Sequence, residues 1–222
     1  MELGLFTCGY QYESIEAAFA DAAAFGYDFI ELWGGRPHAW APDMTAERAA
    51  HLRELSERYN VPIRIYTPEH NGYPYNYMLG DEAQWEDCMR YLTRSMEAAA
   101  QIGASHTLIS VGHGGHTEPQ YRHDRLMRSL RRLAEEARST GQTILLEPLS
   151  PFESNTCTTA AEIAAVLSEL NDPTVCTMCD MVASYVQDET AAEFYQCTGS
   201  AMVHLHIADS DGRSEAHILP GD

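Results

Sequence analysis

The sequence contains no lysine, because all 14 of its basic residues are arginines. Enzymes that form a Schiff base with their substrate, and enzymes that hold pyridoxal phosphate, need a lysine amine as nucleophile. A Walker A phosphate loop also requires a lysine. The missing lysine therefore excludes these three classes.

Basic residues are also few beside acidic ones. The chain has 33 acidic residues against 14 arginines, which gives a net charge of -19 and an isoelectric point near 4.7. Nucleic acids and anionic membranes are bound by basic surfaces. We therefore expect neither a nucleic acid nor a membrane as a partner.

Long apolar runs are missing as well. No stretch reaches the roughly 18 apolar residues of a membrane span. The first residues, Met1 to Gly4, lack the basic and apolar segments of a secretory signal. Six cysteines in such a chain are expected to be reduced thiols. We therefore predict a cytoplasmic protein, whose 45% of hydrophobic residues suffice for a core.

Short β-rich runs alternate with longer helical runs along the whole chain. The predicted strands are residues 3–8, 29–33, 62–67, 107–111, 143–147, 175–180 and 202–207. The predicted helices are residues 14–25, 46–59, 82–102, 122–140, 160–170 and 190–197. Repeated β-α units of this kind indicate a parallel sheet.

The ends of the helical runs carry matching signals. Thr159 and Glu162 form a capping-box pattern at the start of one helix. A glycine closes four of the runs just before a strand, as a left-handed C-cap would. These glycines are Gly26, Gly103, Gly141 and Gly199. The helix boundaries are therefore supported independently of the hydrophobic pattern.

Seven β-α units are compatible with a barrel or with a doubly wound sheet. Polar residues gather at the C-terminal ends of the strands, as at the active rim of a barrel, and no G-x-G-x-x-G follows the first strand. We predict an α/β protein with a (β/α)₈ TIM barrel, formed by one domain over residues 1–222. A complete barrel takes about 250 residues. We therefore expect the eighth strand to be absent from this chain and the domain to be incomplete at its C-terminus.

Three consecutive predicted strands end on side chains of metal-ligand type, namely Glu147, Asp180 and His206. Strand alternation puts His204 on the same face as His206, one pleat deeper, where it suits a supporting role. Each residue alone could equally be a capping acid or a core histidine. Three at equivalent positions of neighbouring strands favour a metal site at the barrel rim. Two carboxylates and an imidazole suit Mn²⁺, Co²⁺, Mg²⁺ or Zn²⁺ better than a thiolate-seeking metal.

Other candidates lie in the loops after the strands. Trp33 follows the second strand beside two glycines and could stack on a sugar, although a tryptophan there is as often part of the core. Glu69 lies in a loop rich in tyrosine, proline and glycine that is long enough to be a lid. Glu153 lies six residues after Glu147 and could reach substrate hydroxyls. We predict substrate contacts for these three residues.

At these residues the sequence resembles the xylose-isomerase-like barrels, a family that includes sugar isomerases, ketose 3-epimerases and endonuclease IV. Within that family it resembles the 3-epimerases of fructosamines such as fructoselysine. The similar stretches run through the whole chain. They are Phe6–Gly9, Glu31–His38, Tyr66–Glu69, Asn71–Asn76, Met78–Asp81, Leu146–Leu149, Glu153–Asn155, Tyr185–Gln187, His204–Gly212 and Pro220–Asp222.

The resemblance implies one divalent metal ion, Mn²⁺ first and Co²⁺, Mg²⁺, Ni²⁺ or Zn²⁺ as alternatives. Its ligands would be Glu147, Asp180, His206 and a glutamate on strand eight that is not in this sequence. The implied reaction inverts C3 of a ketosamine, fructoselysine or psicoselysine, through a cis-enediolate, with two metal-bound glutamates as acid and base. Of these two catalytic groups, only Glu147 can be named here. The family also implies a homo-oligomer.

One departure bears on the substrate. Epimerases of free ketoses place a histidine three residues after the metal-binding aspartate, whereas this chain has Ala183 there. A fructosamine is therefore the expected substrate. Arg213 and His217 are further candidates for substrate contact, or else residues of an ordinary polar loop.

Three alternatives stay open. The chain could be another sugar isomerase or epimerase of this family, such as a ketose 3-epimerase or an aldose-ketose isomerase. It could be a barrel that binds sugar or metal without catalysis. Endonuclease chemistry fits less well, because it needs more histidines at the rim and a surface that tolerates DNA.

Overall fold

The computed structural model describes residues 1–72 and 74–221. Tyr73 and Asp222, which belong to two of the stretches that carry the family resemblance, lie outside the described residues. The strands are β1 (Gly4–Phe6), β2 (Phe29–Gly34), β3 (Ile63–Pro68), β4 (His106–Ser110), β5 (Thr143–Glu147), β6 (Val175–Asp180) and β7 (Met202–His206). The α-helices are α1 (Ile15–Phe25), α2 (Ala46–Tyr59), α3 (Glu82–Ile102), α4 (Pro119–Thr140), α5 (Ala160–Leu170), α6 (Met181–Tyr185) and α7 (Ala191–Thr198). Short 3-10 helices cover Thr7–Tyr10, Ala41–Asp43 and Gly199–Ala201.

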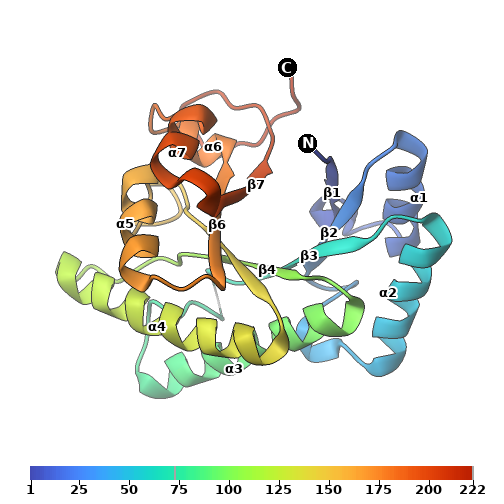
Figure 1. The fold of residues 1–222 in the computed structure, drawn as a ribbon, viewed down its shortest axis with the longest axis horizontal. Coiled ribbons are helices and arrows are strands. Elements are labelled where there is room, and N and C mark those ends of the chain that lie inside the picture. Colours follow the sequence, from blue (N-terminus) through green and yellow to red (C-terminus); the bar gives the residue numbers. More distant parts are fainter. Residues whose placement is uncertain (73, 222) are drawn as a thin grey trace. The chain divides into compact units, whose positions relative to one another are not determined.

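The strands follow one another in the sheet in the order in which they occur in the sequence, β1 to β7 (Figure 1). The strand pairs whose register is given, such as β1 with β2 and β6 with β7, are parallel. Helices occupy the connections between the strands. The predicted succession of parallel β-α units is therefore confirmed, and seven strands are found within the described residues.

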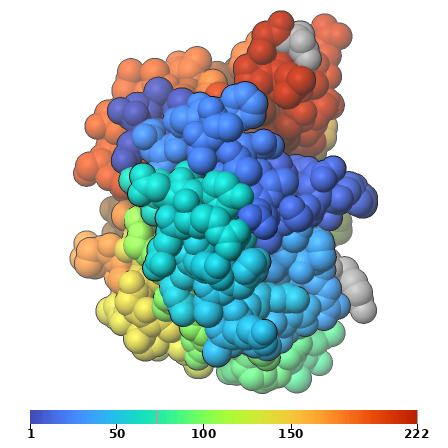
Figure 2. All heavy atoms as spheres, turned by 90° about the vertical axis from the view of Figure 1, so that its right-hand side faces the viewer, coloured from blue at the N-terminus to red at the C-terminus, as the bar shows by residue number. Residues whose placement is uncertain are grey.

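The described residues form two compact units. The first comprises residues 1–69, 90–108 and 136–143. In it α1 and α2 lie side by side, as the blue and cyan atoms of Figure 2 show. The Glu16 carboxylate on α1 accepts hydrogen bonds from Arg58, at 2.7 Å, and from the Tyr59 hydroxyl, at 2.9 Å. Fully buried side chains of this unit include Phe19, Ile30, Leu52, Leu55 and Tyr66.

The second unit comprises residues 70–89, 109–135 and 144–222, of which Tyr73 and Asp222 are not described. It contains β6, β7 and nearly all of β5. Its core includes Tyr77, Leu130, Leu133, Ile163 and Phe194. Two of its buried polar side chains are paired across the unit: the Trp85 indole N–H donates to Ser129 Oγ, and the Tyr77 hydroxyl donates to the Ser110 carbonyl. This core lies beneath the strands whose ends carry the predicted metal-type residues.

The helix caps follow the sequence signals in most cases. Thr159 and Glu162 form the predicted capping box. Gly26 adopts the left-handed conformation at the end of α1, and Gly103 and Gly141 have positive φ values. The prediction for Gly199 is wrong, because its φ of 58° is combined with a ψ of -137°, outside the left-handed helical region.

Two segments differ from the prediction in type. The first strand ends at Phe6 instead of residue 8, because Thr7–Tyr10 turn into a 3-10 helix. The five-residue helix α6 follows directly after Asp180 and was not predicted, since one helical turn leaves no hydrophobic periodicity to detect. Among the described residues, none of the helices combines the length and the apolar character that crossing a membrane would require.

Candidate active site

The side chains of Glu147, Asp180 and His206 converge in the second unit. They are the last residues of β5, β6 and β7, and Asp180 lies opposite His206 in the register of β6 and β7. His206 Nδ1 lies 3.3 Å from Glu147 Oε1 and 3.8 Å from Asp180 Oδ2. One ligand atom from each of the three lies within 4.8 Å of the other two. The predicted convergence of the three strand ends is therefore present in the structure.

The Asp180 carboxylate is held by backbone N–H groups of residues that follow it in the chain. It caps the N-terminus of α6, where its Oδ1 accepts the N–H groups of Val182, at 2.7 Å, and Ala183, at 3.1 Å. Only 8% of the residue is exposed. Burial by itself raises the pKa of Asp180, but hydrogen bonds from His206 and His217 outweigh burial and hold the pKa well below its ordinary value. Asp180 is therefore an ionised carboxylate with a fixed orientation.

His217 reaches the same carboxylate from the loop after β7. Its Nε2 lies 3.1 Å from Asp180 Oδ2, and its Nδ1 lies 3.2 Å from the Glu215 carbonyl oxygen. The hydrogen bond to Asp180 outweighs partial burial and raises the pKa of His217 to about 9. Both ring nitrogens face oxygen acceptors, which is the arrangement of an imidazolium.

Glu153 lies beside this cluster, on the loop after β5. The loop turns back at Ser150, whose carbonyl accepts the N–H groups of Glu153 and Ser154. Burial, followed by the neighbouring carboxyl of Glu215, raises the pKa of Glu153 to about 7. The charges of Glu147 and Asp180 act on it in the same direction. Glu153 is thus protonated for part of the time at neutral pH.

This raised pKa predicts a pH dependence of stability in the metal-free protein. Between the ordinary value of 4.5 and about 7, folded Glu153 binds more protons than unfolded Glu153 does. The free energy of unfolding should therefore fall as the pH rises through this window. Urea midpoints of the wild type and Glu153→Gln, measured on either side of the window with a chelator present, test this. The wild type should lose stability relative to the variant, and parallel changes would contradict the prediction.

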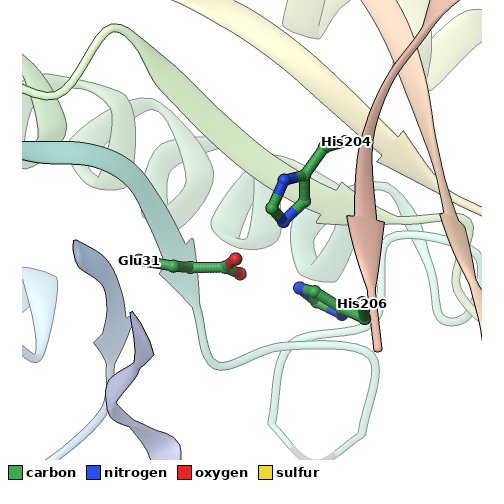
Figure 3. Close-up of side chains that lie close together, drawn as sticks. All are labelled: Glu31, His204 and His206. Atoms are coloured by element: carbon green, nitrogen blue, oxygen red, sulfur yellow. The ribbon is translucent and has the colours of Figure 1, made fainter. Parts of the chain in front are cut away.

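His204 and His206 project from the same side of β7 (Figure 3), with ring centroids 5.2 Å apart and the rings nearly perpendicular. The predicted shared face of these two histidines is therefore confirmed. Glu31, also labelled in Figure 3, belongs to β2 of the first unit, where the Thr67 hydroxyl donates to it at 2.7 Å.

Two predicted substrate contacts, Trp33 and Glu69, meet in the first unit. The indole N–H of Trp33 donates to Glu69 Oε2 at 2.7 Å. The backbone N–H of Trp33 donates to Thr7 Oγ1 at 2.9 Å. A Cβ on Gly35 would lie 2.2 Å from the Trp33 ring, so the glycine is needed where the ring packs against the backbone. The Trp33 side chain is thus held by its hydrogen bond to Glu69 and by its packing against Gly35.

Arg213 is exposed on the loop after β7, and its backbone N–H donates to the Asp211 carboxylate at 2.8 Å. The same loop contacts the cluster through His217 and Glu215. His217 was predicted from the sequence, and Glu215 was not. The Ser150 hydroxyl donates to Glu215, which also acts on Glu153. Glu215 lies two residues before His217, and this closeness to a predicted site residue is the sequence signal that could have identified it.

The three strand-end residues fit a single divalent cation. Ligand atoms that share an ion through bonds of about 2.0–2.3 Å lie roughly 3–4 Å apart, and the observed separations are 3.3 and 3.8 Å. Two carboxylates and one imidazole form a donor set for Mn²⁺, Co²⁺, Mg²⁺ or Zn²⁺. Carboxylate oxygens and an imidazole nitrogen already face one another, so little rearrangement is required.

The fold and this site correspond to a known class. The chain belongs to the family of xylose isomerase-like TIM barrels, whose pattern matches residues 19–222. This membership confirms the predicted fold class. It also explains why the strand ends of the second unit carry the metal-type side chains, since active sites of TIM barrels lie at the C-terminal ends of the strands.

Individual relatives indicate which kind of enzyme this chain is within the family. The fructoselysine 3-epimerase of Escherichia coli O157:H7 is 44% identical over 223 aligned residues, which cover all of this chain and 81% of that protein. A D-tagatose 3-epimerase-like protein has a similar structure, with a TM-score of 0.85 and 18% identity, covering 100% of this chain and 81% of that one. A D-psicose 3-epimerase, crystallised in the presence of D-fructose, has a TM-score of 0.82 and 16% identity, covering 94% and 73%. The two structures show the fold, and the sequence relative confirms an isomerase-class enzyme, a sugar epimerase.

Proposed function

We propose that the protein is a divalent-metal-dependent enzyme that inverts C3 of a ketosamine such as fructoselysine or psicoselysine. The observation that carries the proposal is the convergence of Glu147, Asp180 and His206 in a chain 44% identical to a fructoselysine 3-epimerase. The family resemblance noted in the sequence points to the same reaction. In this proposal the protein is cytoplasmic and a homo-oligomer, and Mn²⁺ is the first candidate ion.

Glu147, Asp180 and His206 would hold the ion. When bound, a divalent cation stabilises negative charge on the substrate oxygens near C2 and C3. The Glu147 carboxylate removes the proton from C3, and the electron pair of that C–H bond becomes the C2–C3 double bond of a cis-enediolate while the π pair of the C2 carbonyl moves onto its oxygen. The C2–C3 π pair then takes up a proton on the opposite face of C3, and the oxygen lone pair re-forms the C2 carbonyl, which completes the inversion. Asp180, fixed by two backbone N–H groups, keeps its charge and orientation throughout.

The charge around the site supports a ketosamine over a free ketose. The C1 amine of a ketosamine is cationic near neutral pH. Two carboxyl groups, Glu153 and Glu215, lie beside the metal-type cluster and act on each other. An ammonium group next to C2 would favour the ionised form of Glu153. Ala183 stands where the resemblance puts a histidine in epimerases of free sugars, which supports the same choice.

Proton exchange tests the proposal. The protein is incubated with Mn²⁺ and fructoselysine in D₂O, and deuterium at C3 is followed by proton NMR. Removal of the C3 proton by Glu147 is sufficient for exchange, so we expect deuterium at C3, with psicoselysine as the inverted product. The same assay with free fructose serves as the comparison.

The outcomes separate the alternatives. Faster exchange on fructose than on fructoselysine would show that the substrate is a free ketose and not a ketosamine. Exchange at C1 or at another carbon would indicate an aldose-ketose isomerase or a different epimerase. Calorimetry that shows binding of the sugar, with exchange at none of its carbons, would leave a sugar-binding barrel without catalysis.

A further inference from the structure

Asp180 uses its two carboxylate oxygens for different purposes. Oδ1 accepts two N–H groups of α6 and is thereby committed to the backbone. Oδ2 faces two imidazoles, His217 at 3.1 Å and His206 at 3.8 Å. A carboxylate oxygen has more than one acceptor direction. It can therefore coordinate an ion on the side of His206 and still accept a hydrogen bond from His217.

The His217 ring is fixed from its own segment. Its Nδ1 lies 3.2 Å from the Glu215 carbonyl oxygen, so the ring turns its Nε2 toward Asp180. Its side chain is 47% exposed, against 10% for Asp180. The half-exposed His217 thus contacts the carboxylate oxygen that the backbone N–H groups leave free.

The segment that carries His217, residues 207–221, is held together by hydrogen bonds between its own residues. Asp209 and Ile218 form an antiparallel bridge with hydrogen bonds of 2.9 and 3.0 Å. The Gly221 N–H donates to the Asp209 carboxylate at 2.9 Å. Outside the segment, Glu215 accepts from the Ser150 hydroxyl. The segment is therefore one folded loop that contacts the candidate site through Glu215 and His217.

We propose that His217 is a positioning residue, which orients the metal-facing oxygen of Asp180 and couples ion binding to the docking of segment 207–221 on the site. The proposal rests on the metal site of the proposed function. Partners of metal ligands fix the orientation of those ligands, and their loss weakens metal affinity by about 10–100-fold. By thermodynamic reciprocity, the ion must stabilise the docked segment by the same factor by which the docked segment strengthens ion binding.

Calorimetric titration of Mn²⁺ into the metal-free protein, without substrate, tests whether His217 strengthens ion binding. His217→Ala should raise the dissociation constant of Mn²⁺ by about 10–100-fold. His217→Gln keeps an N–H donor and should recover most of the affinity. His116→Ala, which removes an exposed histidine from the loop after β4, should bind as the wild type does. Circular dichroism confirms that each variant is folded.

Limited proteolysis tests the coupling. Arg213 is exposed in the segment and is the only basic residue after Arg138, so tryptic cleavage there gives a diagnostic fragment. Saturating Mn²⁺ should slow this cleavage in the wild type, and the slowing should be lost in His217→Ala. Protection that is equal in both proteins would overturn the coupling.

Other outcomes are equally decisive. If His217→Ala binds Mn²⁺ as tightly as the wild type, or more tightly, His217 does not position Asp180. A raised KM with an unchanged metal affinity would make His217 a substrate contact instead. If the wild type itself binds none of the divalent cations, the metal site of the proposed function fails and this inference fails with it.

Discussion

Glu147→Gln is expected to lower kcat by about 10²–10⁴-fold, the contribution of a positioned general base. The amide has nearly the shape of the carboxylate but cannot take up the C3 proton. Its oxygen still lies beside His206, where the carboxylate oxygen is 3.3 Å from Nδ1 in the wild type. Ion binding should therefore be weakened but not abolished. Rates of C3 exchange are compared at a saturating ion concentration, so that the lost proton transfer is measured separately from lost ion affinity.

Glu169→Gln is the matched control, because Glu169 pairs with His123 and Arg131 on an exposed surface. It should exchange the C3 proton at the wild-type rate. A Glu147→Gln variant that retains more than a tenth of the wild-type rate would show that another group removes the proton.

The three metal-type residues could be predicted from the sequence for a simple geometric reason. In parallel strands all C-terminal ends lie at one edge, and side chains alternate with a period of two. Glu147, Asp180 and His206 each occupy the last position of a strand. Local sequence signals, such as the Thr159 capping box, fixed the ends of the intervening helices closely enough to place these positions.

The surroundings of the three residues could not be predicted in the same way. The contact of Glu215 with Ser150 joins residues 65 positions apart in two loops. Loop conformation depends on tertiary contacts that leave no periodic pattern. Asp180 was predicted as a strand end, but its second role as the cap of α6 depends on a helix too short to show periodicity. The convergence of the three side chains was thus predictable, whereas the network that orients them was not.

These two roles of Asp180 can be separated by substitution, and both substitutions should have large effects on ion binding. Asp180→Asn keeps an oxygen for the N–H groups of Val182 and Ala183, and asparagine is as good an N-cap as aspartate. It removes the negative charge that faces His206 and His217. Asp180→Ala removes both the charge and the cap. We expect both variants to lose at least about 100-fold in Mn²⁺ affinity, at or beyond the upper end of what the loss of a ligand's supporting partner costs.

Only the alanine variant should lose the cap. Its free energy of unfolding in the metal-free state should be about 0.5–2 kcal/mol below that of the asparagine variant. Urea denaturation measures this difference, and calorimetry measures the ion affinity. Two variants of equal stability would mean that the cap contributes nothing to folding. An asparagine variant that binds Mn²⁺ as the wild type does would remove Asp180 from the ligand set, and the proposed reaction would then lack the ionised carboxylate that lies beside Glu147 and His206.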